Sequence, residues 1–123
     1  MSMDRDQSYV YYNKGREAYE SGDRRAALEK FGQSIKLFPH FKTLELLGEC
    51  LLREDRFKEA IVYLGAAVGL GNNPFRAHFL LAQAWLAVGE KHDAIVHLKK
   101  AIEMNPDYKA AKELLNESLD GSS

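Results

Sequence analysis

The chain repeats itself with a period in the low thirties. Ala27, Ala60 and Ala94 are separated by 33 and then 34 residues. A fixed period of this length predicts stacked supersecondary units, each of which contacts only its neighbours. Such units bind partners along an extended surface and rarely do chemistry. The other positions that keep this period are Gly15, Gly48 and Ala82; Gly22, Asp55 and Gly89; Phe31, Leu64 and Leu98; Ser34, Ala67 and Ala101; and Pro39, Asn72 and Pro106.

The pattern within each unit is helical. Apolar residues recur at spacings of three and four, as over 75–88 and 94–102, and alternation typical of strands is essentially absent. Gly22 and Gly89 divide their units into two helices, because glycine tolerates the left-handed conformation that ends a helix. Asp55 takes the same place in the second unit. The predicted helices span 8–21, 24–38, 41–53, 56–70, 75–88, 91–104 and 107–119.

The last predicted helix differs from the others in having no partner after it. It carries an apolar stripe of Ala111, Leu114, Leu115 and Leu119 beside a polar face. Terminal repeats need such a polar cap, so we expect this helix to cover the end of the stack and the array to end here. We expect residues 1–7 to be a disordered segment and 120–123 to be a frayed tail.

The repeat resembles the tetratricopeptide repeat (TPR). The best match is the third copy, with Leu81-Ala82, Trp85, Gly89, Asp93-Ala94-Ile95, Leu98, Ala101 and Asn105-Pro106. The departures are Lys14 where leucine is usual, His78 where an aromatic residue is common, and Asn72 where proline would end the unit. The resemblance implies an all-α fold, a right-handed α-solenoid of stacked antiparallel helix pairs. Its repeats are 8–40, 41–74 and 75–108, and the capping helix is 107–119.

Composition excludes several classes of function. The net charge of −1 gives no long-range attraction for nucleic acid or for an anionic membrane. No stretch reaches the roughly 18 uninterrupted apolar residues of a membrane span, and the polar segment 1–7 is not a signal peptide. Cys50 is the single cysteine, so an internal disulfide is impossible and a reducing, cytoplasmic location is the simpler interpretation.

No residues converge on a catalytic or metal site, and we predict that the chain is not an enzyme and needs no cofactor. His92 and His97 are five residues apart, not the three or four that would place two metal ligands on one helix face. Cys50 has no cation at helical reach that would activate it, so a packed core thiol is favoured. Carboxylates such as Glu49 are expected to be solvated.

The first helix of each pair supplies the better candidate site. In the resembled family these helices line a concave groove that binds a partner protein. Tyrosine and arginine, which dominate binding hot spots, are frequent at the matching positions, and an exposed apolar strip usually marks an interaction surface. The candidate groove residues are Tyr9, Tyr12, Asn13, Arg16, Tyr19, Lys42, Leu46, Glu49, Arg76, Phe79, Leu80 and Gln83.

One function of the family can be tested on these residues. Members that bind chaperone tails hold two carboxylates with lysine, asparagine and arginine side chains. The matching positions here are Tyr12, Arg16, Leu46, Arg76 and Leu80, of which only Arg76 is compatible. The sequence therefore argues against binding to heat-shock chaperone C-terminal tails. It favours an apolar or aromatic peptide, or an amphipathic helix.

Two hypotheses of function remain open. In the first, the groove captures a peptide or helix of another protein, and the chain acts as a scaffold, an assembly factor or a chaperone. In the second, the chain is a structural repeat protein that forms a homodimer through the tyrosine-rich first repeat. Mass as a function of concentration separates them.

Overall fold

The computed structural model describes residues 3–120, and over that range its regular elements are all helices. It confirms the predicted all-α solenoid. Two boundaries differ from the prediction by more than one residue, since the first helix begins at Met3 instead of residue 8 and the last begins at Lys109 instead of 107. Residues 121–123 of the expected tail lie outside the described range. The helices are α1 (Met3–Glu20), α2 (Arg24–Leu37), α3 (Phe41–Arg53), α4 (Phe57–Leu70), α5 (Phe75–Ala87), α6 (Lys91–Met104) and α7 (Lys109–Leu119).

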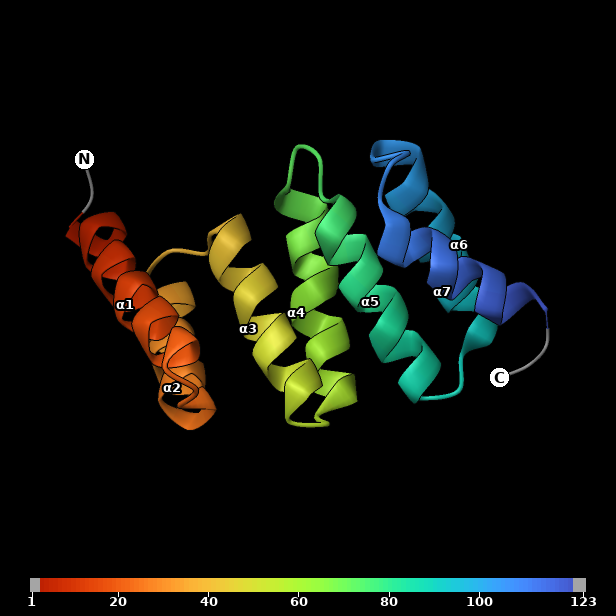
Figure 1. Ribbon diagram of the computed structural model, residues 1–123. Coiled ribbons are helices and arrows are strands. Elements are labelled where there is room, and N and C mark those ends of the chain that lie inside the picture. Colours follow the sequence, from red (N-terminus) through yellow and green to blue (C-terminus); the bar gives the residue numbers. More distant parts are fainter. Residues whose placement is uncertain (1–2, 121–123) are drawn as a thin grey trace.

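The helices form two layers. Within each of the three pairs, α1 packs on α2, α3 on α4 and α5 on α6, and successive pairs stack side by side. Figure 1 shows α1, α3, α5 and α7 in the nearer layer, with α2, α4 and α6 behind them. We call the surface presented by α1, α3 and α5 the first-helix face, and the surface presented by α2, α4 and α6 the second-helix face.

The turns inside the pairs form where the sequence predicts them. Gly22 has a φ of +89° and Gly89 a φ of +86°, the left-handed region in which a side chain is disfavoured. Asp55 holds a φ of +59° at the equivalent turn, which aspartate tolerates better than most residues. After the first turn, the side chain of Asp23 accepts a hydrogen bond from the backbone N–H of Ala26 and caps α2.

Glycine on one helix faces a large residue on its partner inside the first two pairs. A Cβ atom at Gly15 would lie 2.5 Å from the ring of Phe31, and one at Gly48 would lie 2.5 Å from Leu64. Phe31 and Leu64 are fully buried, as is Leu98 of the third pair. These contacts explain the repeated small and large positions, because close packing needs one helix to give room to the other.

The first turns of α1 are fixed by contacts with α2 and the segment that follows it. The hydroxyl of Ser8 donates to the backbone oxygen of Ser34 at 2.9 Å, and the two serine hydroxyls are also 2.9 Å apart. The guanidinium of Arg5 lies 4.5 Å from the centre of the Phe38 ring. These contacts hold residues 3–7 in a helix where the sequence predicted disorder.

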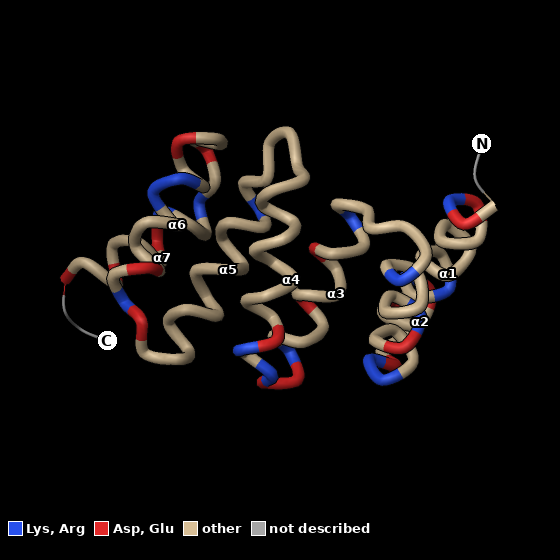
Figure 2. Tube along the Cα trace, turned by 180° about the vertical axis from the view of Figure 1, so that it is seen from behind, with Lys and Arg blue, Asp and Glu red and all other residues tan. Residues whose placement is uncertain are grey.

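Helix α7 covers α6 as the sequence predicts. Ala111 is fully buried with Ala94, Leu98 and Ala101, although Leu119, which the predicted stripe included, is 58% exposed. Seen from behind, long stretches of α4 and α5 carry no charged residue (Figure 2). Among residues 3–120, no helix combines the length and apolar character that crossing a membrane requires.

Candidate functional site

The predicted groove residues differ widely in exposure. On α1, Asn13 and Arg16 are exposed, Tyr9 is 59% exposed and Tyr19 is half-buried. On α3, Lys42 is exposed and Leu46 half-buried. On α5, Arg76, Phe79 and Gln83 are half-buried. The first-helix face therefore offers a partner these nine side chains to different degrees.

Three of the predicted residues are buried. Leu80 is 2% exposed and belongs to the main hydrophobic core, so its placement on a binding surface is wrong. The physical reason is that α5 packs against α4, α6 and α3, which leaves it a narrow solvent-facing stripe. Tyr12 is 9% and Glu49 4% exposed, so both side chains lie mainly beneath the surface.

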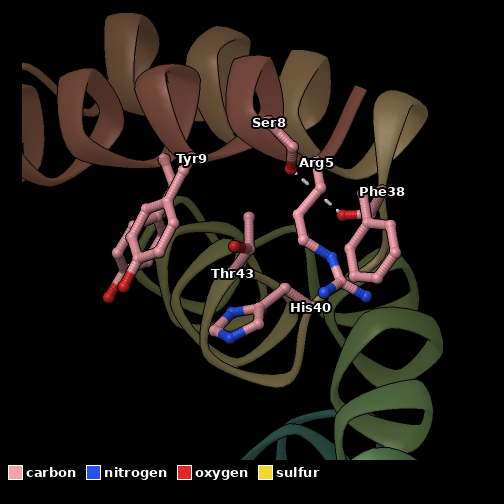
Figure 3. Close-up of a pocket in the computed structure, with 7 residues that line it drawn as sticks. Arg5, Ser8, Tyr9, Phe38, His40 and Thr43 are labelled. Atoms are coloured by element: carbon pink, nitrogen blue, oxygen red, sulfur yellow. Dashed lines mark hydrogen bonds between the residues drawn. The ribbon is translucent and has the colours of Figure 1, made fainter. Parts of the chain in front are cut away.

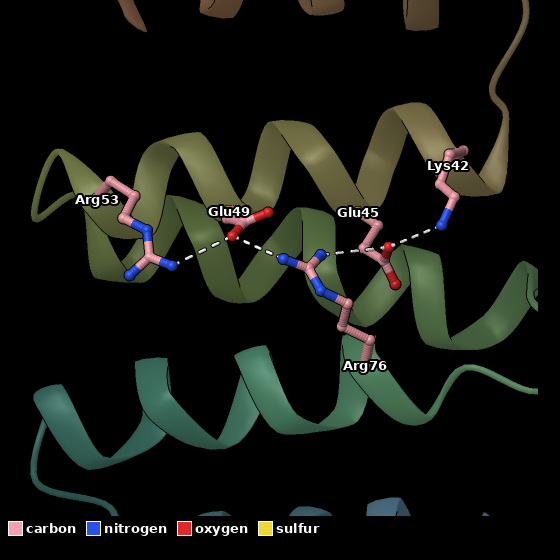
Figure 4. Close-up of polar contacts among 5 residues, drawn as sticks. All are labelled: Lys42, Glu45, Glu49, Arg53 and Arg76. Carbon is pink, nitrogen blue, oxygen red and sulfur yellow. Dashed lines mark hydrogen bonds and ion pairs between the residues drawn. The ribbon is translucent and has the colours of Figure 1, made fainter. Parts of the chain in front are cut away.

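The expectation that Glu49 is solvated is also wrong, because Glu45 and Glu49 form the centre of a buried ionic network (Figure 4). Arg76, from the next pair, reaches across to both. Its Nη2 atom is 2.7 Å from Glu49 Oε2, and its Nη1 atom is 3.5 Å from Glu45 Oε1. Lys42 approaches Glu45 at 3.4 Å and Arg53 approaches Glu49 at 3.2 Å. The network thus ties α3 to α5.

This arrangement places negative charge below the surface and positive charge above it. The side chains of Glu45 and Glu49 are 2% and 6% exposed, whereas those of Lys42, Arg53 and Arg76 are between 40% and 51% exposed. Burial lowers the pKa of Arg76, but the hydrogen bond to Glu49 and the negative charges of Glu49 and Glu45 together outweigh burial and raise that pKa. A partner on this face would meet the cationic groups first.

Tyr19 joins the network from α1. A hydrogen bond to its hydroxyl is the main reason that the pKa of Arg53 is raised. Burial raises the pKa of Tyr19 itself, so the phenol stays neutral. Polar contacts therefore connect the first helices of all three repeats.

A histidine pair on α5 and α6 is a feature that the sequence did not reveal. The rings of His78 and His97 stack with centres 5.2 Å apart, and their Nδ1 atoms are 2.9 Å apart. The imidazole ring of His78 therefore occupies the position at which an aromatic residue is common in the family. The two residues are 19 positions apart, so no local motif pointed to them.

The remaining candidates for chemistry have no activating surroundings in the described part of the chain. Cys50 is fully buried, as the sequence predicted, and burial raises the pKa of its thiol to about 12. Among residues 3–120, no three histidine, cysteine or carboxylate side chains gather closely enough to hold a metal ion.

Comparisons with known proteins agree with this architecture. Family models described as tetratricopeptide repeat match residues 12–74 and 51–116. The chain therefore belongs to the tetratricopeptide repeat family, whose domains are generally interaction modules without catalytic activity. No curated protein matches the sequence.

Solved TPR domains share the fold at low sequence identity. The first TPR domain of Spaghetti (RPAP3), bound to the HSP90 peptide SRMEEVD, is 17% identical with a TM-score of 0.90, and the match covers 94% of this chain and 93% of that one. The Arabidopsis OM64 TPR domain is 18% identical with a TM-score of 0.92, covering 96% and 98%. The TPR2B domain of yeast Sti1, in complex with pHsp70, is 21% identical with a TM-score of 0.83, covering 97% and 98%.

Proposed function

We propose that this TPR protein binds a peptide or an amphipathic helix of another protein along its first-helix face, as a scaffold, an assembly factor or a chaperone. The observation that carries the proposal is the series of exposed tyrosine, polar and cationic side chains along this face. Exposed Tyr9, Asn13 and Arg16 on α1 continue into the cationic groups of Lys42, Arg53 and Arg76. Tyrosine and arginine of this kind are enriched among residues that dominate binding energies.

The buried network supports binding because it holds the cationic groups in place. Arg76 and Arg53 share one oxygen of Glu49, so neither guanidinium has to be ordered when a partner arrives. A side chain that is fixed beforehand loses less conformational entropy on binding. The same contacts connect α3 to α5, so the face is one surface and not three separate helices.

We propose that heat-shock chaperone tails are not the partner. Two structural neighbours bind such peptides, but they are only 17% and 21% identical to this chain, and this similarity extends to the fold alone. Tyr12 and Leu80, at two of the positions that the clamp would use, are buried, and the guanidinium of Arg76 already contacts two carboxylates. Titration with the peptide SRMEEVD checks this, and saturable binding would contradict it.

A paired capture experiment tests the function. The variant Tyr9→Ser/Arg16→Ser is expected to recover at least ten-fold less partner from native extract than wild type does. Both side chains are exposed, so replacing them leaves the hydrophobic core intact. The matched control is Val62→Ser/Val96→Ser on the second-helix face, where the side chains are 66% and 38% exposed. Equal recovery by the groove variant, with an unchanged circular dichroism spectrum, would refute the proposal.

Self-association through the first repeat is the second candidate. It is favoured by three apolar residues on α1, Met3, Tyr9 and Val10, which are 87%, 59% and 42% exposed. Sedimentation equilibrium over a hundred-fold range of concentration distinguishes the two functions, since a constant monomer mass excludes the dimer.

Consistent with a reducing environment for Cys50, we place the protein in the cytoplasm.

A further inference from the structure

A cavity of about 340 Å³ opens between α1 and α3 (Figure 3). Arg5, Ser8, Tyr9 and Tyr12 line it from α1, Phe38 and His40 from the segment between α2 and α3, and Thr43 from α3. Its volume falls within the range of pockets that bind small ligands or anchoring side chains. It lies at the end of the first-helix face where Tyr9 is exposed.

The walls of the cavity are mostly aromatic. The rings of Tyr9 and Tyr12 meet edge to face with centres 5.7 Å apart, and the His40 ring lies 6.0 Å from Tyr12 and 6.3 Å from Tyr9. Phe38 forms a further wall. Rings presented at different angles offer faces and edges to another ring, and such contacts contribute beyond simple burial of area.

The polar groups of the cavity restrict what it accepts. The guanidinium of Arg5 lies against the Phe38 ring, and both residues line the cavity (Figure 3). Within residues 3–120, the Oγ1 atom of buried Thr43 has no hydrogen-bond partner, which favours an occupant with a polar edge over a purely aliphatic one.

We propose that this cavity receives an aromatic side chain of the partner peptide, with an acidic group of the same peptide beside it at Arg5. The aromatic walls select the ring and the positive charge of Arg5 selects the acid. The assignment rests on the proposed function and gives it a first point of attachment. A peptide anchored here would continue along the first-helix face toward Lys42 and Arg76.

Binding of small probes to the full chain, followed by amide NMR shifts, tests the assignment. Indole-3-acetate combines an aromatic ring with an acid, and we expect it to bind with a dissociation constant of about 1 mM, as its size allows. The shifts should centre on Tyr9, His40 and Thr43. Tryptamine, which carries the same ring with a positive charge, and cyclohexylacetate, which has no aromatic ring, should each bind at least five-fold more weakly.

Variants identify the contacts. Arg5→Gln should weaken indole-3-acetate at least three-fold and leave tryptamine unchanged, whereas Arg25→Gln, at an exposed position on α2, should change neither. Shifts centred elsewhere, equal binding of all three probes, or no effect of Arg5→Gln would overturn the proposal. Shifts of the same amides on dilution of the protein alone would do so too, by identifying a second copy of the chain as the occupant.

The outcome is separable from that of the proposed function. Failure of indole-3-acetate to bind, together with loss of the partner by Tyr9→Ser/Arg16→Ser, would reject the cavity and keep the face. Probe binding with full recovery of the partner by that variant would reject the face as the site of capture.

Discussion

Replacing Gly48 with alanine is expected to lower the free energy of unfolding by about 2 kcal/mol. The new Cβ atom would lie 2.5 Å from the side chain of Leu64, a distance that non-bonded Cβ atoms in folded proteins essentially never show. Leu64 is fully buried and cannot move into solvent, so α3 and α4 would have to separate. The gain in helix propensity on going from glycine to alanine offsets only part of this cost.

Gly65 provides the matched control, because it lies on α4, is exposed, and would place a Cβ atom with nothing within 4 Å. Gly65→Ala should stabilise the protein by about 0.5–1 kcal/mol. Urea unfolding of both variants measures the difference. A Gly48→Ala protein as stable as Gly65→Ala would show that the helices of this pair are not held at the distance described here.

The second large effect is a loss of stability in mild acid that depends on His78. Burial, together with the neighbouring His97, lowers the pKa of His78 from 6.5 to about 4. The unfolded chain therefore binds a proton more readily than the folded one between these values, and stability falls as the pH falls from about 6.5 to about 4. The hydrogen bond between the two Nδ1 atoms needs one of them unprotonated, which adds a geometric reason.

The charges around the pair determine the size of the effect. Lys100 lowers the pKa of both histidines, while Asp93 raises that of His97 without overcoming its burial. If the whole pKa shift of His78 counted toward stability, the free energy of unfolding would fall by about 3 kcal/mol. Because water reaches half-buried His97 beside it, we expect a smaller loss of about 2 kcal/mol.

His78→Phe tests this prediction, because phenylalanine keeps a ring against His97 and cannot be protonated. Its stability should decline less between pH 7 and pH 4.5 than that of wild type, whereas His92→Gln, at an exposed position on α6, should follow wild type. Comparing the curves removes the contributions of carboxylates that titrate in all three proteins. Parallel curves for wild type and His78→Phe would contradict the assignment.

The fold was predictable because its determinants are local. Helix starts and ends follow Gly22, Asp55, Gly89 and the prolines, and the first three of these have the positive φ values that the turns within the pairs require. The start of α1 was missed because residues 3–7 carry no apolar periodicity. What orders them is the contact of Ser8 with Ser34, and 26 positions separate the two residues.

The site was predictable in outline and not in depth. The repeat identified which helices share a face, and Tyr9, Asn13 and Arg16 are exposed there as expected. Burial of Glu49 could not be read from its own helix, since its strongest partner, Arg76, lies 27 positions later. One signal was present in the sequence: Glu45 and Glu49 are one helical turn apart, and Arg76 is the second residue of α5, the first helix of the following repeat.

The central claim is that a partner binds the first-helix face, and site-specific photo-cross-linking tests it most directly. A photoreactive residue would replace Asn13 or Lys42 on that face, and Val62 or Val96 on the second-helix face, each at an exposed position. We expect a covalent adduct of one defined mass from Asn13 and Lys42 and none from Val62 or Val96. Adducts from Val62 or Val96 alone would place the partner on α4 and α6 and contradict the account.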